Sequence, residues 1–143
     1  MSVQIEIANE ATDELVAGLN QLMPQLSANA TTLTTTDVEA LVGFPSTTVF
    51  IAREAGRIVG SLTLVVFPIP TGLRAWIEDV VVDESARGAG VGEALTNAAI
   101  VESRRRQVRS IDLTTRPSRE DANRLYARLG FELRETNVYR LNI

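Results

Sequence analysis

A glycine-rich segment, Arg87 to Gly92, has the residue types that best suit binding of a charged ligand. It follows a β-branched apolar run that ends at Val82, and apolar residues continue after it at the helical spacing of Leu95, Ala98 and Ala99. Glycine lets the main chain bend sharply or lets a ligand approach it closely. Because the N–H groups and the positive dipole end of the following helix would point back at the turn, the segment suits a phosphate or pyrophosphate.

The chain contains no histidine and no cysteine. These absences exclude disulfides, thiol chemistry, Cys-based metal sites and a Ser–His pair, and they remove the commonest metal ligand. Acid–base chemistry at neutral pH would therefore fall to carboxylates, tyrosine, backbone groups or water. We expect no metal cofactor.

Other nucleotide-binding patterns match the glycine segment less well. The dinucleotide fingerprint Gly-x-Gly-x-x-Gly would need a third glycine where Glu93 stands, because Gly92 comes one residue early. A Walker loop is absent, since no Gly-Lys-Ser/Thr occurs. A purely structural tight turn remains the alternative.

Two motifs in this chain resemble those of the GNAT N-acetyltransferase superfamily. Arg87-x-x-Gly90-x-Gly92 matches the family's Arg/Gln-x-x-Gly-x-Gly/Ala signature, and the preceding Ile-Glu-Asp-Val-Val-Val-Asp resembles its central strand. Ala122 to Phe131 is similar to the family's Leu-Tyr-x-x-x-Gly-Phe helix ending. The resemblance covers Phe50 to the end by motif, and the first 49 residues by element order only.

The resemblance implies acetyl-CoA as cosubstrate. The backbone of the glycine turn would bind its pyrophosphate, and the edge of the preceding strand would pair with its pantetheine arm. An N–H group there, of Val80 or Val82, would stabilise the oxyanion. Arg87 would add charge or fix the turn. The implied cofactor-binding residues are Val80, Val81, Val82, Arg87, Gly88, Ala89, Gly90, Val91, Gly92, Glu93, Arg119 and Asn123.

The resemblance also implies two catalytic side chains. Tyr126, with a phenol pKa near about 10, would protonate the departing thiolate; alternatively it is a core aromatic. Glu78, with a free pKa of about 4.3, would deprotonate the amine directly or through water, from the strand face shared with Trp76 and Val80. Asp79, on the opposite face, is the second candidate, and a structural carboxylate is the alternative for Glu78.

Two positions in the last helix depart from the pattern or leave a choice. Arg119 stands where many family members carry a cofactor-binding asparagine, seven residues before Tyr126, so it binds a phosphate instead or leaves that contact unmade. Asn123 reaches the cofactor or is an ordinary surface amide. The resemblance also implies that the Thr-rich loop from Ser27 to Thr36 helps to shape the acceptor pocket; the alternative is a simple solvated loop.

The composition is that of a globular protein: 143 residues, 45% hydrophobic and 22% charged, with a formal net charge of −4. The negative charge disfavours nucleic acid and permits a cationic amine. The beginning of the chain lacks the basic and apolar segments of a signal peptide, and the longest uncharged run, Ile58 to Leu73, is interrupted by proline and glycine. We expect a cytoplasmic protein without a membrane partner.

We predict one α/β (α+β) domain over residues 1–143, with a mixed, mostly antiparallel sheet of about seven strands and helices on both faces. Asn9 would cap the first helix, and Thr36-x-x-Glu39 would be the capping box of the second. The predicted order is β-α-α-β-β-β-α-β-α-β-β, with strands at Val3–Ala8, Thr48–Arg53, Arg57–Phe67, Arg74–Val82, Ser110–Thr115, Phe131–Arg134 and Val138–Leu141, and the third helix at about Gly90–Arg106.

The predicted function is transfer of acetyl from acetyl-CoA to a primary amine by direct attack in a ternary complex. The charge favours a polyamine or aminoglycoside; an amino acid or protein N-terminus is also open. The Ile77–Asp83 stretch is similar to that of glucosamine-phosphate acetyltransferases, a lesser candidate because no binding set for the sugar phosphate is evident. The alternatives are a non-catalytic acyl-CoA-binding module and a ligand-free structural homodimer; a homodimer is also compatible with the enzyme.

Overall fold

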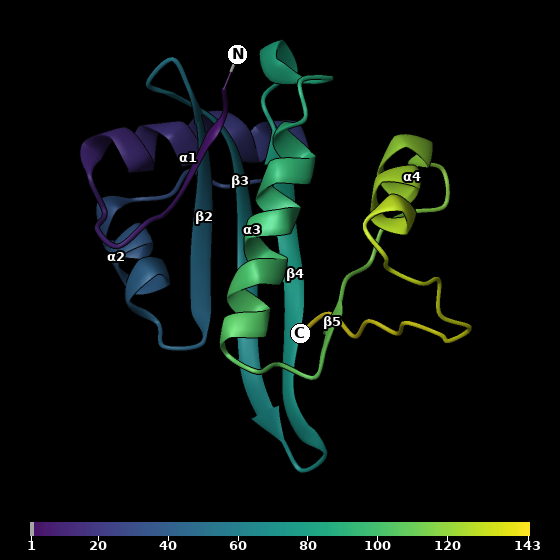
Figure 1. Ribbon diagram of the computed structural model, residues 1–143. Helices are drawn as coiled ribbons and strands as arrows, with labels where there is room; N and C mark the ends of the chain where they lie inside the picture. The colour runs from purple at the N-terminus through teal and green to yellow at the C-terminus, as the bar shows by residue number, and fades with distance from the viewer. Residues whose placement is uncertain (1) are drawn as a thin grey trace. The chain divides into compact units, whose positions relative to one another are not determined.

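Five strands form one sheet in the order β1-β2-β3-β4-β5, shown in Figure 1 of the computed structural model, which describes residues 2–143. The elements in chain order are β1 (Gln4–Ile7), α1 (Asp13–Leu26), α2 (Thr35–Gly43), β2 (Thr47–Glu54), β3 (Arg57–Ile69), β4 (Gly72–Val82), the short 3₁₀-helix η1 (Glu84–Ala86), α3 (Val91–Arg105), β5 (Ser110–Asp112) and α4 (Glu120–Arg128).

The pairing confirms a mixed, mostly antiparallel sheet. β1 to β4 pair antiparallel in sequence order, while β4 and β5, joined through α3, pair parallel. A two-residue turn links β2 and β3: Ala55 and Gly56 both have positive φ (51° and 78°), as a type I′ hairpin turn requires. Parallel strands need a long crossover, and α3 supplies it.

Helices cover both faces of the sheet (Figure 1). α1 and α2 bury their apolar side chains against one face, where Leu19, Val38 and Ile51 are among the core residues. α3 packs on the other face through Val91 and Leu95. Its close approach depends on Gly60 of β3, because a Cβ there would lie 3.0 Å from the Val91 side chain.

The first two helices begin at threonines other than those predicted. Thr12, and not Asn9, caps α1, since its hydroxyl accepts from the Leu15 N–H (3.1 Å). The capping box of α2 is Thr34-x-x-Asp37 rather than Thr36-x-x-Glu39. Both sequences match the pattern, but only the earlier start puts Leu33 and Val38 at the flanking positions that pack together in the core.

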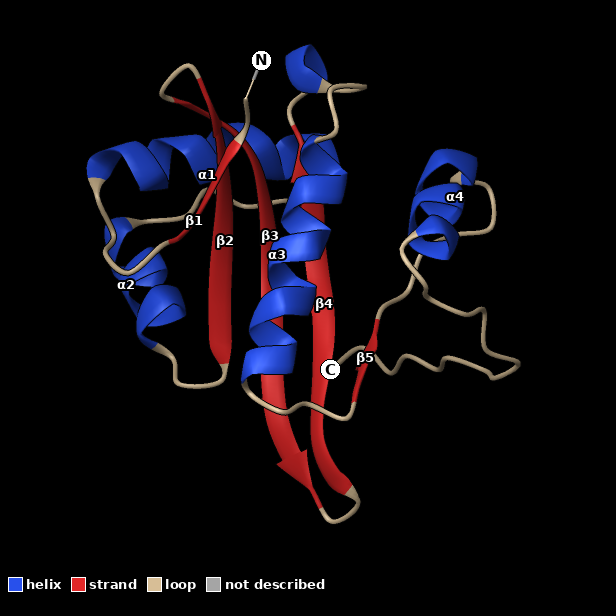
Figure 2. Cartoon of the chain, in the orientation of Figure 1, coloured by secondary structure: helices blue, strands red, loops and turns tan. Residues whose placement is uncertain are grey.

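The prediction of about seven strands is wrong in the described residues. Residues 131–143 contain no helix or strand, so the strands predicted at Phe131–Arg134 and Val138–Leu141 are absent (Figure 2). Their alternating apolar residues are exposed: Leu133 is 98% exposed and Leu141 83%. Alternation predicts a strand only where a neighbouring strand and a buried face are available, and the short β5 offers few backbone partners.

The chain divides into two compact units, one extending to Leu113 and the other from Thr114 to Ile143. The first contains the whole sheet with α1, α2 and α3, and the second contains α4 and the residues that follow it. That residues 1–143 form one domain stays a prediction.

Candidate functional site

The outer edge of β4 is paired for only part of its length. β5 pairs in parallel with the three residues from Arg74 to Trp76. In the described chain no strand pairs with this edge from Ile77 to Val82, where β4 continues alone. Unpaired strand edges expose rows of N–H and C=O groups, so this edge is available to an extended ligand.

The direction of the backbone amides identifies which ones face the free edge. The Asp83 N–H donates to the carbonyl of Val59 on β3 (2.7 Å). Successive N–H groups of an extended strand point to opposite sides. The N–H groups of Val82 and Val80 therefore point to the free edge, whereas that of Val81 points to β3.

A β-bulge at Asp79 and Val80 changes the side-chain alternation of β4. Both residues stand opposite a single residue of β3, and Asp79 has a φ of 48°. The extra residue places Val81, instead of Val80, on the face of Glu78, which corrects the prediction from simple alternation. The Val81 side chain is 5% exposed and belongs to the core beneath α1.

Glu78 is exposed and oriented by a neighbour. Its Oε1 accepts a hydrogen bond from Nε1 of Trp76 (2.6 Å). Asp79 is exposed as well. The carboxylate of Glu78 thus has a hydrogen-bond partner within the protein and is also open to a ligand.

The glycine turn adopts a conformation that requires glycine. Gly88 and Gly90 have φ values of 82° and 80°, and the segment from Arg87 to Gly90 is exposed. A Cβ at either glycine would meet no atom within 4 Å, so the backbone conformation and not crowding selects glycine. The space over the turn is open.

The turn leads into a helix end without a side-chain cap. Gly90 occupies the N-cap position, and the first intrahelical bond runs from the Ala94 N–H to its carbonyl (3.0 Å). The amides of Val91 and Gly92, in the first turn, have no partner within the helix. Val91 buries its side chain, so it can offer a ligand only its backbone. This set of donors fits a phosphate-bearing group.

Arg87 ties the turn to the end of β4. Its Nε donates to the carbonyl oxygen of Val82 (3.3 Å), and the side chain is otherwise exposed. The contact agrees with a turn-fixing role for Arg87, one of the two roles predicted for it. Ala89 is exposed at the tip, and Glu93 lies in the first turn of α3, half-buried.

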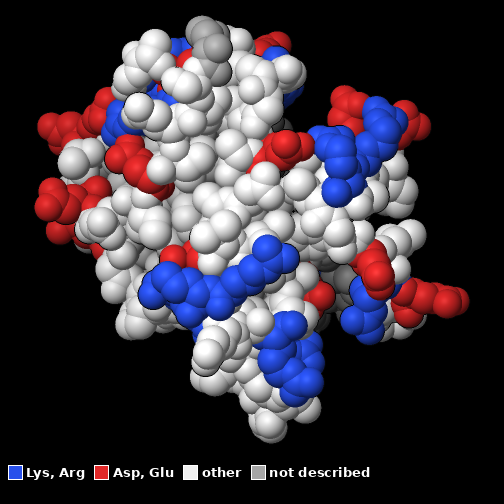
Figure 3. All heavy atoms as spheres, viewed as in Figure 1, with Lys and Arg blue, Asp and Glu red and all other residues white. Residues whose placement is uncertain are grey.

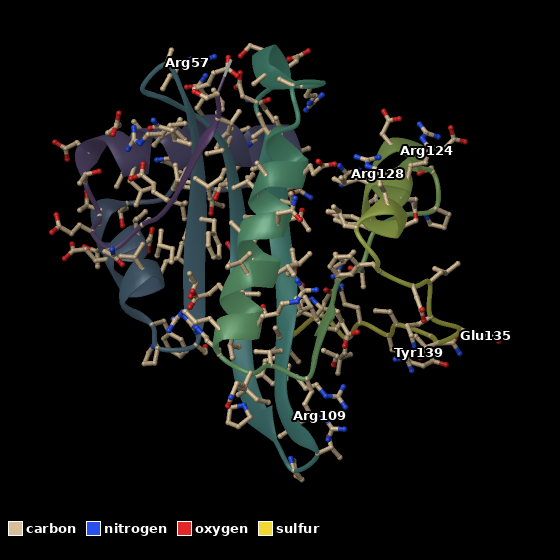
Figure 4. The ribbon with its side chains drawn as sticks, in the orientation of Figure 1. Arg57, Arg109, Arg124, Arg128, Glu135 and Tyr139 are labelled. Carbon is tan, nitrogen blue, oxygen red and sulfur yellow. The ribbon has the colours of Figure 1, made fainter. Side chains whose placement is uncertain are left out.

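A buried carboxylate that the sequence prediction missed anchors the turn. Asp83 is 6% exposed and accepts hydrogen bonds from Nε2 of Gln25 (2.8 Å), from the Ser85 N–H (3.1 Å) and from the Ser85 hydroxyl. The bonds from Ser85 and then Gln25 hold the pKa of Asp83 at about 2. Arg57, at the tip of the β2–β3 hairpin in Figure 4, lies 3.7 Å from the carboxylate.

Gln25 completes this clasp, defined here as Gln25, Arg57, Asp83 and Ser85. Its Oε1 accepts from the Glu84 N–H (2.9 Å), so the last turn of α1 holds η1 at two points. Asp83-x-Ser85 after a strand is a local turn signal that could have been noticed. The contact with Gln25, 58 residues away, has no local signal.

The arginines at the other end of α3 are engaged within the protein. Figure 3 shows Lys/Arg side chains gathered over this region. Arg105 binds both oxygens of Glu102 (3.0 and 2.5 Å), and Arg106 binds one of them (2.6 Å) and the Thr48 hydroxyl (3.1 Å). These bonds, with that from Arg105 first, hold the pKa of Glu102 at about 2. Arg105 and Arg106 are therefore held by contacts within the protein at the C-terminal end of α3.

In the second unit, Tyr126 is a half-buried residue of α4. Its ring packs edge-on against Phe131, with centroids 5.7 Å apart and planes at 66°. Burial raises the pKa of Tyr126 above its usual value of 10, and the charge of Arg119 opposes this in part. The phenol therefore remains protonated at neutral pH. The packing also matches the alternative of a core aromatic.

Arg119 and Asn123 shape the beginning of α4. Arg119 occupies the N-cap position, and its carbonyl accepts from the backbone N–H (3.0 Å) and the side-chain amide (2.8 Å) of Asn123. The same amide donates to the Arg116 carbonyl (3.0 Å). These bonds favour a structural role for the Asn123 side chain.

Within residues 2–143 no group of three or more His, Cys, Asp or Glu side chains is arranged to hold a metal ion. No helix in the same residues is long and apolar enough to cross a bilayer.

Residues 15–131 match the acetyltransferase (GNAT) family, and the chain belongs to this family. Over 95 residues it is 44% identical to the glucosamine 6-phosphate N-acetyltransferase of Trypanosoma brucei brucei; the match covers 64% of this chain and 63% of that enzyme, a little under two thirds of its length.

Two solved structures show the same fold. An acetyltransferase from Trypanosoma brucei has a TM-score of 0.82 at 27% identity, covering 99% of this chain and 100% of that one. A transcriptional regulator from Bacillus halodurans C-125 has a TM-score of 0.79 at 29% identity, with the same coverage.

Proposed function

We propose that this protein is an N-acetyltransferase that moves the acetyl group of acetyl-CoA to a primary amine by direct attack in a ternary complex. The observation that carries the proposal is the unpaired edge of β4 that leads straight into the glycine turn and the uncapped end of α3. An extended ligand on this edge would have backbone partners beside it, and its phosphates would meet the helix end.

Within this proposal, acetyl-CoA supplies the activated acetyl thioester. The amides from Gly88 to Glu93 bind its pyrophosphate, and the edge from Val80 to Val82 pairs with its pantetheine arm. The edge-facing N–H of Val80 or Val82 donates a hydrogen bond to the acetyl oxygen as negative charge develops there. Arg87 keeps the turn in place, with its charge close to the phosphates.

The two proton transfers are assigned to Glu78 and Tyr126. Glu78, exposed beside the bulge, takes a proton from the incoming amine directly or through water. Tyr126, protonated at neutral pH, gives a proton to the leaving thiolate. Arg119 and Asn123 support the beginning of the helix that carries Tyr126.

The first acceptor to test is glucosamine 6-phosphate. The support is the 44% identity with an enzyme named for that substrate. A polyamine and an aminoglycoside form the comparison group, because the net negative charge favours cationic amines.

Isothermal titration of the purified protein with acetyl-CoA and with CoA tests the cofactor part. We expect both to bind, and thiol release with an amine panel then tests transfer. A folded protein that binds neither at millimolar concentration would sink the proposal and make the glycine turn a structural one.

A non-catalytic acyl-CoA-binding module is the second candidate, favoured by the similarity to a protein described as a transcriptional regulator. It predicts binding of acetyl-CoA without thiol release for any amine in the panel.

A further inference from the structure

One face of β4 carries a row of polar side chains around its only tryptophan. Arg74 stands two residues before Trp76 and Glu78 two residues after it, and Asp112 is the direct partner of Trp76 on β5. Residues two apart on a strand, and direct partners on adjacent strands, share a face. Arg74, Trp76, Glu78 and Asp112 therefore line one face; we name them the β4 strip.

The strip lies where the helices leave the sheet uncovered. On β3 its partners are Thr63, Val65 and Phe67, which are half-buried, whereas Leu64 on the α3 side is fully buried. Figure 2 shows β3 and β4 continuing beyond the helices toward their hairpin. The strip is thus a partly open surface next to the core formed by α1 and α2.

The charges along the strip are separated. Glu78 stands at one end of the strip, oriented by the indole N–H (2.6 Å), and Asp112 lies beside Trp76 on β5. Arg74 stands at the opposite end. In the described chain it forms no ion pair, and its Nε is shielded from solvent without a hydrogen-bond partner. An unpaired guanidinium N–H that is also cut off from water carries a desolvation cost, which a phosphate oxygen bound at this guanidinium would relieve.

We propose that the β4 strip is the acceptor site and that the acceptor is an amino-sugar phosphate. This inference rests on the proposed acetyl transfer. The amine lies between Glu78, which is beside the unpaired edge of β4, and Asp112 on β5. The phosphate lies at Arg74, whose planar fork suits it. The sugar ring packs on the indole of Trp76.

The span and the charge pattern select this class. Arg74 and Glu78 are about 13 Å apart at roughly 3.3 Å per residue, a separation that their side chains and one phosphorylated hexose bridge. A polyamine or an aminoglycoside carries cations at both ends and would place one of them against Arg74. The structure thus argues for an acceptor with charges of both signs.

Trp76 makes the test direct, because it is the only tryptophan and its emission reports on this surface. Glucosamine 6-phosphate and glucosamine are titrated into the wild type, Arg74→Gln and the control Arg104→Gln, an exposed arginine of α3 on the other face of the sheet. We expect a saturable change with glucosamine 6-phosphate, an affinity at least 10-fold weaker in Arg74→Gln, and no change in the control. Glucosamine, which has no phosphate, should bind the wild type and Arg74→Gln with the same weak affinity.

An unchanged affinity in Arg74→Gln, or no emission change in the wild type, overturns the assignment. If Arg74→Gln does not fold, Asp112→Asn replaces it. This variant should bind glucosamine 6-phosphate and glucosamine more weakly than the wild type does, by the same factor for each. Wild-type affinity of Asp112→Asn for the two amines again overturns the site. Calorimetry with acetyl-CoA on the same wild-type preparation separates the two proposals. Binding of acetyl-CoA without a response to glucosamine 6-phosphate removes the acceptor site and leaves the proposed transfer standing, whereas no binding of acetyl-CoA removes the transfer itself.

Discussion

At the scale of single residues, the hydroxyl of Tyr126 can be removed with little change in packing. Tyr126→Phe keeps the edge-on contact with Phe131 and deletes only the proton donor. We expect turnover to fall by roughly 10²-fold or more, the usual range for loss of a general acid, with acetyl-CoA affinity nearly intact. Thiol-release kinetics and isothermal titration measure the two quantities. Wild-type turnover in this variant would refute the acid role.

Asp83 gives a prediction about stability and pH. Its pKa of about 2 in the folded protein lies below the value of about 3.9 for a free aspartate, so its charged form stabilises the fold. This contribution is complete above about pH 4 and is lost as the pH falls toward 2. Asp83→Asn should lower the free energy of unfolding by about 1–3 kcal/mol at pH 7, since it disturbs a buried hydrogen-bond network. The free energy of unfolding of this variant should also fall less than that of the wild type as the pH is lowered from 4 to 3.

Denaturant unfolding of the wild type and Asp83→Asn at pH 7, 4 and 3 measures this contribution. The matched control is Glu84→Gln, the same change at the exposed neighbour. A parallel loss of stability in the wild type and Asp83→Asn below pH 4 would contradict the assigned role.

At the scale of elements, the beginning of α3 can be tested by one charge. Aspartate and asparagine have similar size and both tolerate the positive φ of Gly90 better than other side chains. Gly90→Asp should weaken acetyl-CoA binding at least 10-fold more than Gly90→Asn, because only aspartate places a negative charge at the proposed phosphate site. Titration calorimetry at two salt concentrations checks this. The difference in acetyl-CoA affinity between Gly90→Asp and Gly90→Asn should be smaller at the higher salt concentration. Equal affinities would mean that phosphate does not bind here.

The elements that the sequence predicted well are those with local signals. The β-branched run of β4, the glycine turn and the apolar spacing of α3 follow one another within thirty residues, and all three were confirmed with boundaries shifted by only one or two residues. The α1 cap moved from Asn9 to Thr12 because several residues there can cap a helix.

What the sequence could not predict depends on partners far along the chain. The bulge at Asp79 is set by the register between β3 and β4, and the Gln25–Asp83 bond joins residues 58 positions apart. Asp112 enters the β4 strip only through the pairing of β5. The two closing strands were predicted from alternation alone, and without a buried face the alternation did not produce them.

At the scale of the whole molecule, the charge is unevenly divided. Up to Leu113 the chain has eight arginines and fourteen acidic residues. From Thr114 onward it has six arginines and four acidic residues. It contains no lysine, so no ε-amino group of this chain competes with the acceptor for acetyl groups.

The exposed apolar side chains near the C-terminus lead to a prediction about assembly. Tyr139 and Leu141 are 89% and 83% exposed, and exposed apolar clusters mark association surfaces. We expect a homodimer, with twice the chain mass of 15.6 kDa by light scattering, and Leu141→Glu should shift it toward the monomer. Arg140→Gln, the neighbouring control, should not. A monomeric wild type at micromolar concentration would contradict this prediction.

The clasp of Gln25, Arg57, Asp83 and Ser85 also has a consequence for motion. Gln25 binds the Asp83 carboxylate and the Glu84 amide at once, so the last turn of α1 and the segment before the glycine turn can separate only by breaking both bonds. We therefore expect them to open together as one unit. The Thr-rich loop from Ser27 onward begins directly after that unit, so stiffening of the turn by a ligand would also restrain the loop.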